Sequence, residues 1–332
     1  MSVFLGVDGG GTKTDFLLVD DTGSILATYR GGSAYYFEVG IDGLRQMLAN
    51  GIRATVSAVS LSPADITYSF LGLPAYGENE SMRPRLDRIA EETLSPARYS
   101  CANDVVCGWA GALPDGDGIA VVAGTGSIAY GEWGSRSARA GGWGELFGDE
   151  GSAFWLAREA LSLFSRMSDG RSPRAALYDL VRSHFHVSSD LELCGAVYGP
   201  PPLTRSEVAA LSRLAGQAAR VGDRAAMQLL EQAAEELASL VHAVRDALHA
   251  PLDRRVPASY CGGLLQPGGE LLPLFERALR ASDRQYQLAP PRLQPSAGAA
   301  LRAATLSGAA LTTEAVARLV LTHPFHAAEN TS

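Results

Sequence analysis

The sequence predicts an α/β protein of two domains, and three observations lead to this prediction. The chain has 332 residues, which is enough for two domains that each bury a hydrophobic core. Short apolar runs bounded by turn residues alternate with longer segments of helical periodicity. The opening pattern of strand, glycine-rich turn with threonine, and strand starts again near Ile119. We therefore expect a first domain over 1–112 and a larger second domain over 113–332.

The first half opens with three strands. Val3–Val7 leads into glycines, Phe16–Val19 is the second apolar run, and the turn DDTG predicts a hairpin into Ile25–Tyr29. Further elements are then expected: helices over 41–57 and 81–93, strands over 66–73 and 98–102, and a helix that ends at Ala112.

The second half repeats this opening and then becomes mostly helical. Ile119–Ala123 leads into the turn GTGS, and Ile128–Trp133 returns as its hairpin partner. The remaining expected elements are helices over about 153–167, 173–185, 204–219, 223–249, 270–281 and 296–305, and strands over 256–261 and 285–288. The helices between about 153 and 250 read as an insertion, and the terminal helix could pack back on the first domain.

Composition excludes several classes of protein. A formal net charge of −8 leaves no basic surplus for a nucleic-acid binder. No window approaches the 18 apolar residues of a membrane span, and the N-terminus lacks the charged and apolar regions of a signal peptide. The four cysteines are scattered without a CxxC pair, which argues against a zinc site or a disulfide framework. We therefore expect a cytoplasmic protein without membrane or nucleic-acid partners; a homodimer stays open.

The first glycine turn, GVDGGGTKTD, is a candidate phosphate site. It is neither a P-loop nor a dinucleotide fingerprint, because a strand and not a helix follows it. Backbone N–H groups at Gly10 and Gly11 can cradle phosphate oxygens, and Thr12 and Lys13 add a hydroxyl and the only lysine in the chain. Asp8 is a hard oxygen ligand suited to Mg²⁺ through water. An ordinary hairpin turn is the alternative.

Asn103 and Asp104 lie where the strand at 98–102 meets the next helix. One interpretation is a helix N-cap, for which both residue types are favoured. The other is a reactive carboxylate, because ligands of open α/β sheets bind at the carboxyl edge of the strands. Such a carboxylate can accept the proton of a hydroxyl that attacks a phosphate.

Three further segments carry candidate residues. The turn at Gly124, Thr125 and Gly126 repeats the first phosphate turn, although a simple turn is an equal alternative. The segment CGGLLQPGGE could admit an adenine ring beside its glycines. In GGWGELFGDEGSAFW, Asp149 can cap the following helix, accept hydrogen bonds from sugar hydroxyls with Trp143 on an apolar sugar face, or do both.

Taken in order, these segments resemble the actin-like superfamily, which includes heat-shock chaperone ATPases and sugar kinases. The motifs are DGGGTKTD, NDVVCGWAGA, VVAGTGS, YCGGLLQPGG and PSAGAALRAA, along nearly the whole chain. The run GGWGELFGDEGSAFW is similar to that of the N-acetylglucosamine kinases, which belong with the activator ATPases of 2-hydroxyacyl-CoA dehydratases. The resemblance implies two ribonuclease H-like domains with a cleft between them.

The resemblance also implies a role for individual residues. Asp104 looks like the catalytic base and Asp8 like the Mg²⁺ ligand. The residues that would bind ATP are Gly10, Gly11, Thr12, Lys13, Gly124, Thr125, Gly126, Gly262 and Gly263. Those that would bind the sugar are Tyr35, Asn103, Asp104, Gly142, Trp143, Gly144 and Asp149. Tyr35 departs from the family, since many of these kinases carry an asparagine there.

The implied reaction is ATP- and Mg²⁺-dependent phosphorylation of the 6-hydroxyl of an amino sugar. N-acetylglucosamine is the first expectation, with N-acetylmuramic acid or glucosamine as rivals. An activator ATPase is the alternative from another class, but Cys101 and Cys107 lack a spacing that fits a bridging iron–sulfur cluster. A non-enzymatic sugar-sensing ATPase is the third.

Overall fold

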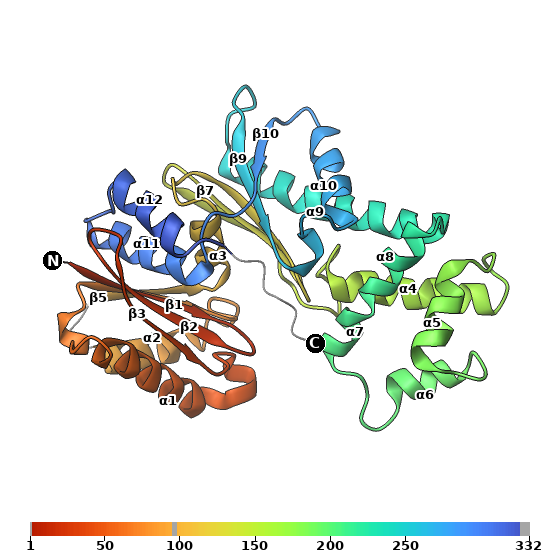
Figure 1. The fold of residues 1–332 in the computed structure, drawn as a ribbon, viewed down its shortest axis with the longest axis horizontal. Coiled ribbons are helices and arrows are strands. Elements are labelled where there is room, and N and C mark those ends of the chain that lie inside the picture. The colour runs from red at the N-terminus through yellow and green to blue at the C-terminus, as the bar shows by residue number, and fades with distance from the viewer. Residues whose placement is uncertain (1, 95–97, 326–332) are drawn as a thin grey trace. The chain divides into compact units, whose positions relative to one another are not determined.

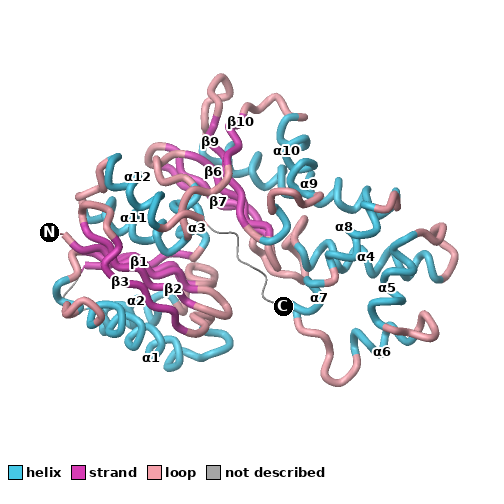
Figure 2. The backbone as a smooth tube through the Cα atoms, viewed as in Figure 1, coloured by secondary structure: helices cyan, strands magenta, loops and turns pink. Residues whose placement is uncertain are grey.

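A computed structural model describes residues 2–94 and 98–325 of the chain (Figures 1 and 2). It contains two five-stranded sheets accompanied by helices, so the predicted α/β class with two domains is confirmed. Two compact units are formed, one by Met1–Ala120 with Pro290–Ser332 and the other by Val121–Ala289. The second unit is therefore inserted between two parts of the first in sequence.

The first unit is built on a mixed sheet with the strand order β3-β2-β1-β4-β5. The strands are β1 (Val3–Gly9), β2 (Thr14–Asp20), β3 (Ile25–Gly31), β4 (Tyr68–Leu73) and β5 (Arg98–Asn103). β1, β2 and β3 form an antiparallel meander, as the hairpin turns predict, while β4 and β5 run parallel to β1. The carboxyl ends of β1, β4 and β5 therefore share one edge of the sheet.

Helices cover both faces of this sheet (Figure 1). They are α1 (Tyr36–Ser57), α2 (Arg83–Leu94), α3 (Val105–Ala112), α11 (Pro295–Ser307) and α12 (Thr313–Thr322), with a short 3₁₀ turn at Pro63–Asp65. Alternate residues of β1, including Leu5 and Val7, pack with α1 and α2 in one core. On the opposite face, a Cβ at Gly6 would lie 2.3 Å from the carbonyl oxygen of Ser296, so glycine lets α11 lie directly on the strand.

The second unit repeats the topology of the first, with the order β10-β9-β6-β7-β8. Its strands are β6 (Gly118–Ala123), β7 (Ser127–Trp133), β8 (Arg136–Gly141), β9 (Val256–Cys261) and β10 (Tyr286–Ala289). Its helices are α4 (Ala153–Ser168), α5 (Ala176–Phe185), α6 (Glu192–Tyr198), α7 (Arg205–Ala210), α8 (Ser212–Arg220), α9 (Arg224–Leu248) and α10 (Leu271–Arg280), with a 3₁₀ turn at Gly263–Leu265. In both sheets the first strand is central and the next two form a meander beside it.

The structure differs from the expected elements in a few places. The expected helix over 204–219 is two helices, α7 and α8, that meet at Leu211. The strand β8 and the helices α6 and α12 were not predicted. β8 has the polar sequence RSARAG, which lacks the apolar alternation of a half-buried strand.

Candidate functional site

The first glycine turn joins β1 to β2 and is exposed from Gly11 to Lys13. The N–H of Gly10 donates to the carbonyl oxygen of Lys13 at 2.9 Å and closes the turn. A Cβ at Gly10 would lie 2.8 Å from that same oxygen, whereas the space around Gly11 is open. The turn is therefore closed by its own backbone, and its exposed side can approach a phosphate.

Asp8 and Asp104 are brought to the same edge of the first sheet. Asp8 pairs with Gly72 on β4, and Gly72 pairs with Ala102 on β5, two residues before Asp104. A Cβ at Gly72 would lie 3.1 Å from the Cα of Asp104 and 2.2 Å from the sulfur of Cys107. Glycine at this position therefore allows the start of α3 to lie directly on β4, which places Asp104 beside Asp8.

The side chain of Asp104 does not cap α3. The residue has helical backbone angles, φ −59° and ψ −26°, and its carboxylate accepts no capping hydrogen bond. Asn103 fills that role instead, because its side-chain oxygen accepts a hydrogen bond from the N–H of Val105 at 3.2 Å. The two adjacent residues thus have different roles. The Asn103 side chain stabilises the start of α3, and the Asp104 carboxylate does not.

Electrostatics around Asp8 suit a cation. Burial raises the pKa of the Asp8 carboxyl well above its usual range, and the carboxylates of Asp104 and Asp15 raise it further, while Lys13 opposes them. Within the described ranges no three His, Cys, Asp or Glu side chains gather as a metal cluster. Mg²⁺ needs no such cluster, since it keeps several waters and is held by one or two carboxylates with substrate phosphates. The oxygen donors at Asp8 therefore fit Mg²⁺.

The loop after β3 is tied to the first glycine turn. The N–H of Ala34 donates to the carbonyl oxygen of Gly10 at 2.9 Å, which places Tyr35 near the turn. Tyr35 precedes α1, and its ring lies 5.4 Å from that of Phe37.

The next residue, Tyr36, is 6% exposed, and its buried hydroxyl has no hydrogen-bond partner among the residues that the structure describes. Burial raises the pKa of Tyr36, and the charge of Glu78 adds to the effect. The state of this hydroxyl becomes visible only in the folded chain, because it depends on how the core packs around it.

The second glycine turn is bound to the start of α4. The carbonyl oxygens of Gly124 and Thr125 accept hydrogen bonds from the N–H groups of Ala153 and Phe154, at 2.9 and 3.3 Å. Ser152 is the N-cap of α4, since its hydroxyl accepts from the N–H of Trp155. The turn over 124–126 is therefore hydrogen-bonded to the start of α4, directly after the loop over 141–152. Asp149 is therefore not the N-cap of α4, which was one of the roles predicted for it from the sequence.

Asp149 instead lies with the second turn. Its Oδ1 accepts from the N–H of Ser127 at 3.3 Å, and its Oδ2 accepts from the guanidinium of Arg205. A Cβ at Gly126 would lie 2.9 Å from Asp149 Oδ2, so the carboxylate fills the space beside this glycine. Burial raises the pKa of Asp149, and the contacts with Ser127 and Arg205 lower it. Arg205 was not predicted as a site residue, because it lies 56 positions away from Asp149 in the chain.

The other predicted residues of this unit have different surroundings. The N–H of Gly142 donates to the carbonyl oxygen of Ser127 at 2.8 Å, which ties that end of the loop to β7. Gly144 has open space around it, and Trp143 is 68% exposed, so its ring covers no core.

The glycines after β9 also meet the second turn. A Cβ at Gly262 would lie 2.3 Å from the carbonyl oxygen of Ala123, directly before that turn. With φ at +99°, Gly262 also requires the backbone freedom of glycine. Gly263 begins the 3₁₀ turn that follows.

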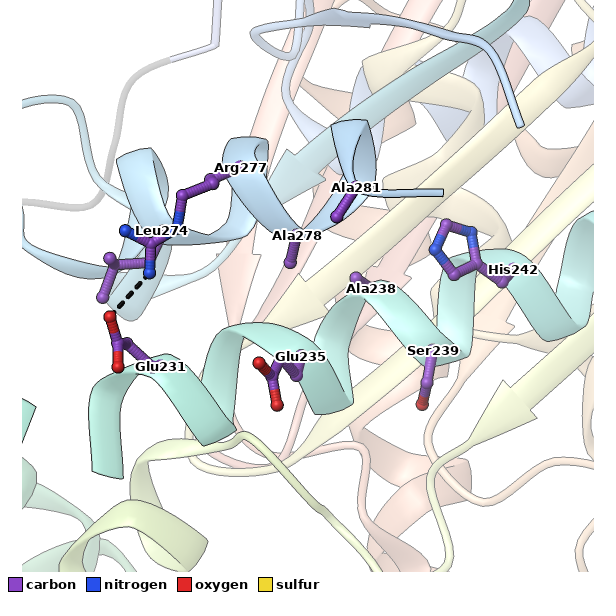
Figure 3. A pocket seen from close by; sticks show the side chains of 9 residues that line it. All are labelled: Glu231, Glu235, Ala238, Ser239, His242, Leu274, Arg277, Ala278 and Ala281. Carbon is purple, nitrogen blue, oxygen red and sulfur yellow. Dashed lines mark hydrogen bonds and ion pairs between the residues drawn. The ribbon is translucent and has the colours of Figure 1, made fainter. Parts of the chain in front are cut away.

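The structure thus forms two groups, each within one unit. The first joins Asp8, the turn at 10–13, Tyr35, Asn103 and Asp104. The second joins the turn at 124–126, the loop with Asp149, and the Gly262 backbone. A separate cavity of about 210 Å³ lies between α9 and α10, lined among others by Glu235, His242 and Ala278 (Figure 3). None of the predicted site residues lines it.

No helix in the described part of the chain is long and apolar enough to cross a bilayer.

Comparison with known proteins relates this chain to nucleotide-using enzymes. The profile of the BadF/BadG/BcrA/BcrD ATPase family matches residues 5–303. The chain is 28% identical over 314 residues to an N-acetyl-D-glucosamine kinase of Dictyostelium discoideum, covering 91% of this chain and 97% of the relative. It is 27% identical over 285 residues to an N-acetylmuramic acid/N-acetylglucosamine kinase of Clostridium acetobutylicum, covering 84% and 90%. A crystal structure of a candidate N-acetylglucosamine kinase from Chromobacterium violaceum is 30% identical and superposes with a TM-score of 0.69, covering 91% and 98%.

Proposed function

Because this chain belongs to the BadF/BadG/BcrA/BcrD ATPase family, which uses ATP, we propose that it is an ATP-dependent kinase of an amino sugar. The acceptor is the 6-hydroxyl, first of N-acetylglucosamine, with N-acetylmuramic acid and glucosamine as rivals. An N-acetyl-D-glucosamine kinase and an N-acetylmuramic acid/N-acetylglucosamine kinase both match over most of this chain. We also propose a cytoplasmic protein that could pair as a homodimer.

A single observation carries the mechanism. Asp104 lies at the carboxyl edge of the first sheet, next to Asp8, and its carboxylate does not cap α3. In the proposed reaction it accepts the proton of the 6-hydroxyl as the oxygen attacks the γ-phosphate. The N–H groups at 11–13 and 125–126 donate to phosphate oxygens, since those of Gly10 and Gly124 already donate to Lys13 and Gly126, and the loop with Asp149 orients the sugar. Asp8 would hold Mg²⁺, which neutralises charge on the phosphates.

The activator-ATPase alternative has less support from the cysteines. Cys107 is buried in α3, where its thiol contacts the carbonyl oxygen of Val7 at 3.7 Å. Burial raises the pKa of the Cys107 thiol well above its usual range, which favours the neutral thiol over the thiolate that a cluster needs. Cys107 is therefore a core residue.

The proposal is tested by sugar-dependent ADP release. Purified protein is incubated with Mg-ATP and, separately, N-acetylglucosamine, N-acetylmuramic acid, glucosamine or glucose, and the product is assigned by phosphorus NMR. Release that depends on an amino sugar and yields a 6-phosphate supports the proposal. Release at the same rate without sugar contradicts it and favours an ATPase without a small-molecule acceptor.

Lys13→Ala is expected to raise the KM for ATP without unfolding the protein. Lys13 is half-exposed, with its Nζ 3.8 Å from Asp15, and such pairs contribute little to stability. We expect a rise of roughly 10-fold in KM, since backbone N–H groups supply the rest of the phosphate binding. Steady-state kinetics and thermal unfolding measure both effects.

Arg30→Ala is the matched control, because Arg30 pairs with the same Asp15 from β3. It should leave the KM for ATP unchanged. A large drop in melting temperature for Lys13→Ala, with an unchanged KM, would assign Lys13 a structural role.

Tyr35→Asn is expected to change the order of preference among the three amino sugars. The phenol is larger than an amide and reaches differently, and it lies next to the loop bonded to Gly10. The ratios of kcat/KM for the three sugars measure the effect, with Tyr29→Asn on β3 as the control. An unchanged order would place Tyr35 outside the sugar pocket.

A further inference from the structure

We propose that Arg205 is a positioning residue of the sugar site: from the helical insertion, it holds the Asp149 carboxylate in place beside the second phosphate turn. This inference rests on the proposed function and names a residue outside every motif of the sequence. It makes the insertion part of the sugar site.

Arg205 is presented to the loop by a well-defined helix start. It is the first residue of α7, and the preceding Thr204 forms a capping box with Glu207. α7 packs against α4, the helix that follows the loop over 141–152. The backbone that carries the guanidinium is therefore anchored on both sides.

The guanidinium contacts two acids of the same loop. Its Nη2 donates to Oδ2 of Asp149, and its Nε lies 3.1 Å from Oε2 of Glu145. The Asp149 side chain is 4% exposed, whereas those of Arg205 and Glu145 are 42% and 44% exposed. The contact between Arg205 and Asp149 is therefore the more buried of the two, and the contact between Arg205 and Glu145 is exposed to solvent.

The pair also packs against the second phosphate turn. A Cβ at Gly126 would lie 2.9 Å from both Arg205 Nη2 and Asp149 Oδ2. The other oxygen of Asp149 accepts from the Ser127 N–H, directly after that turn. With both oxygens engaged, the carboxylate has one orientation. The backbone of Asp149 is left-handed, φ +56°, a conformation that aspartate adopts more readily than most residues.

Arg205 also favours the ionised form of Asp149. Burial is the main cause that raises the pKa of this carboxyl, Glu145 raises it as well, and Arg205 lowers it. An ionised carboxylate only accepts hydrogen bonds, which suits sugar hydroxyls as donors. Without Arg205 the pKa rises further. Sugar affinity, present above the pKa and lost below it, is then lost at a higher pH than in the wild type.

The experiment compares Arg205→Gln and Arg205→Lys with the wild type by calorimetric sugar binding and by kinetics from pH 5 to 8. We expect Arg205→Gln to weaken N-acetylglucosamine binding by about 10-fold or more, because a buried carboxylate loses a charged donor. The loss should grow as the pH falls. The KM for ATP should change by less than about 3-fold, since Arg205 acts through Asp149. Arg205→Lys, which keeps the charge, should restore part of the affinity.

Two controls separate the possible causes. Arg277→Gln removes an exposed arginine–carboxylate pair of the same unit, with Glu231 on α9 (Figure 3), and should change neither sugar affinity nor its pH dependence. In an Asp149→Asn background, Arg205→Gln should add little further loss, because the two residues act as a unit.

The outcomes are distinct. Additive losses in the double variant, or a rise in the KM for ATP with unchanged sugar binding, would overturn the positioning role. A loss equal at all pH values that lysine does not restore would do the same. If the wild type itself binds no amino sugar, the proposed function is contradicted, and this inference falls with it.

Discussion

Asp104→Asn is expected to lower turnover by about 10²- to 10⁴-fold while leaving sugar affinity nearly unchanged. The amide has the shape of the carboxylate but cannot accept the proton of the 6-hydroxyl. A capping role would predict survival of activity, since asparagine is as good a cap as aspartate. In the structure the Asp104 side chain does not cap α3, so a stability effect through the helix start is not expected. Single-turnover rates and calorimetric sugar binding measure the two quantities separately.

Asp115→Asn is the matched control for this substitution. Asp115 lies in the same unit, where it pairs with Arg292 at the surface. The control should keep normal turnover. If Asp104→Asn also kept near-normal turnover with the preferred amino sugar, Asp104 would not be the catalytic base.

Glucose is expected to be phosphorylated about 10²-fold less efficiently than the preferred amino sugar, or worse. A site that hydrogen-bonds the 2-substituent leaves a buried group unpaired when that substituent is missing. The Tyr36 hydroxyl, which is buried with no partner among the described residues and is adjacent in sequence to Tyr35, is our candidate for such a group. The comparison is of kcat/KM for both sugars at equal ATP.

Tyr36→Phe tests whether this hydroxyl reads the 2-substituent. The substitution removes only one oxygen from a buried side chain. It should reduce the ratio of kcat/KM for the amino sugar to kcat/KM for glucose. Equal kcat/KM for glucose and N-acetylglucosamine in the wild type would show that the pocket ignores the 2-substituent. If the ratio of kcat/KM for the two sugars is unchanged in Tyr36→Phe, the Tyr36 hydroxyl does not recognise the 2-substituent.

Local patterns in the sequence were enough to predict most of the fold. The hairpin turn at 20–23 and the glycine turns at 9–11 and 124–126 mark where strands end, and such turn chemistry depends on adjacent residues only. The repeated opening predicted two similar sheets, and the strand orders confirm it. The polar strand β8 was missed because its residues lack apolar alternation.

The same local patterns named the candidate residues, and the family match agrees with the motifs that carried the resemblance. They could not decide between capping and chemistry for Asp104 and Asp149. That choice depends on where a side chain points relative to residues distant in the chain. The structure gives the capping role to Asn103 at one helix and to Ser152 at the other.

The sequence by itself therefore determined the fold class, the family and the motif residues, because each is encoded in short segments. Only the tertiary structure decided which groups meet. Gly72 brings Asp104 beside Asp8 because the absent Cβ lets α3 lie on β4. Arg205 reaches Asp149 from 56 residues away because α7 packs on α4, and the hydroxyl of Tyr36 loses its water only when the core forms around it. Long-range contacts of this kind leave no periodic signal in the chain, since they depend on packing between elements.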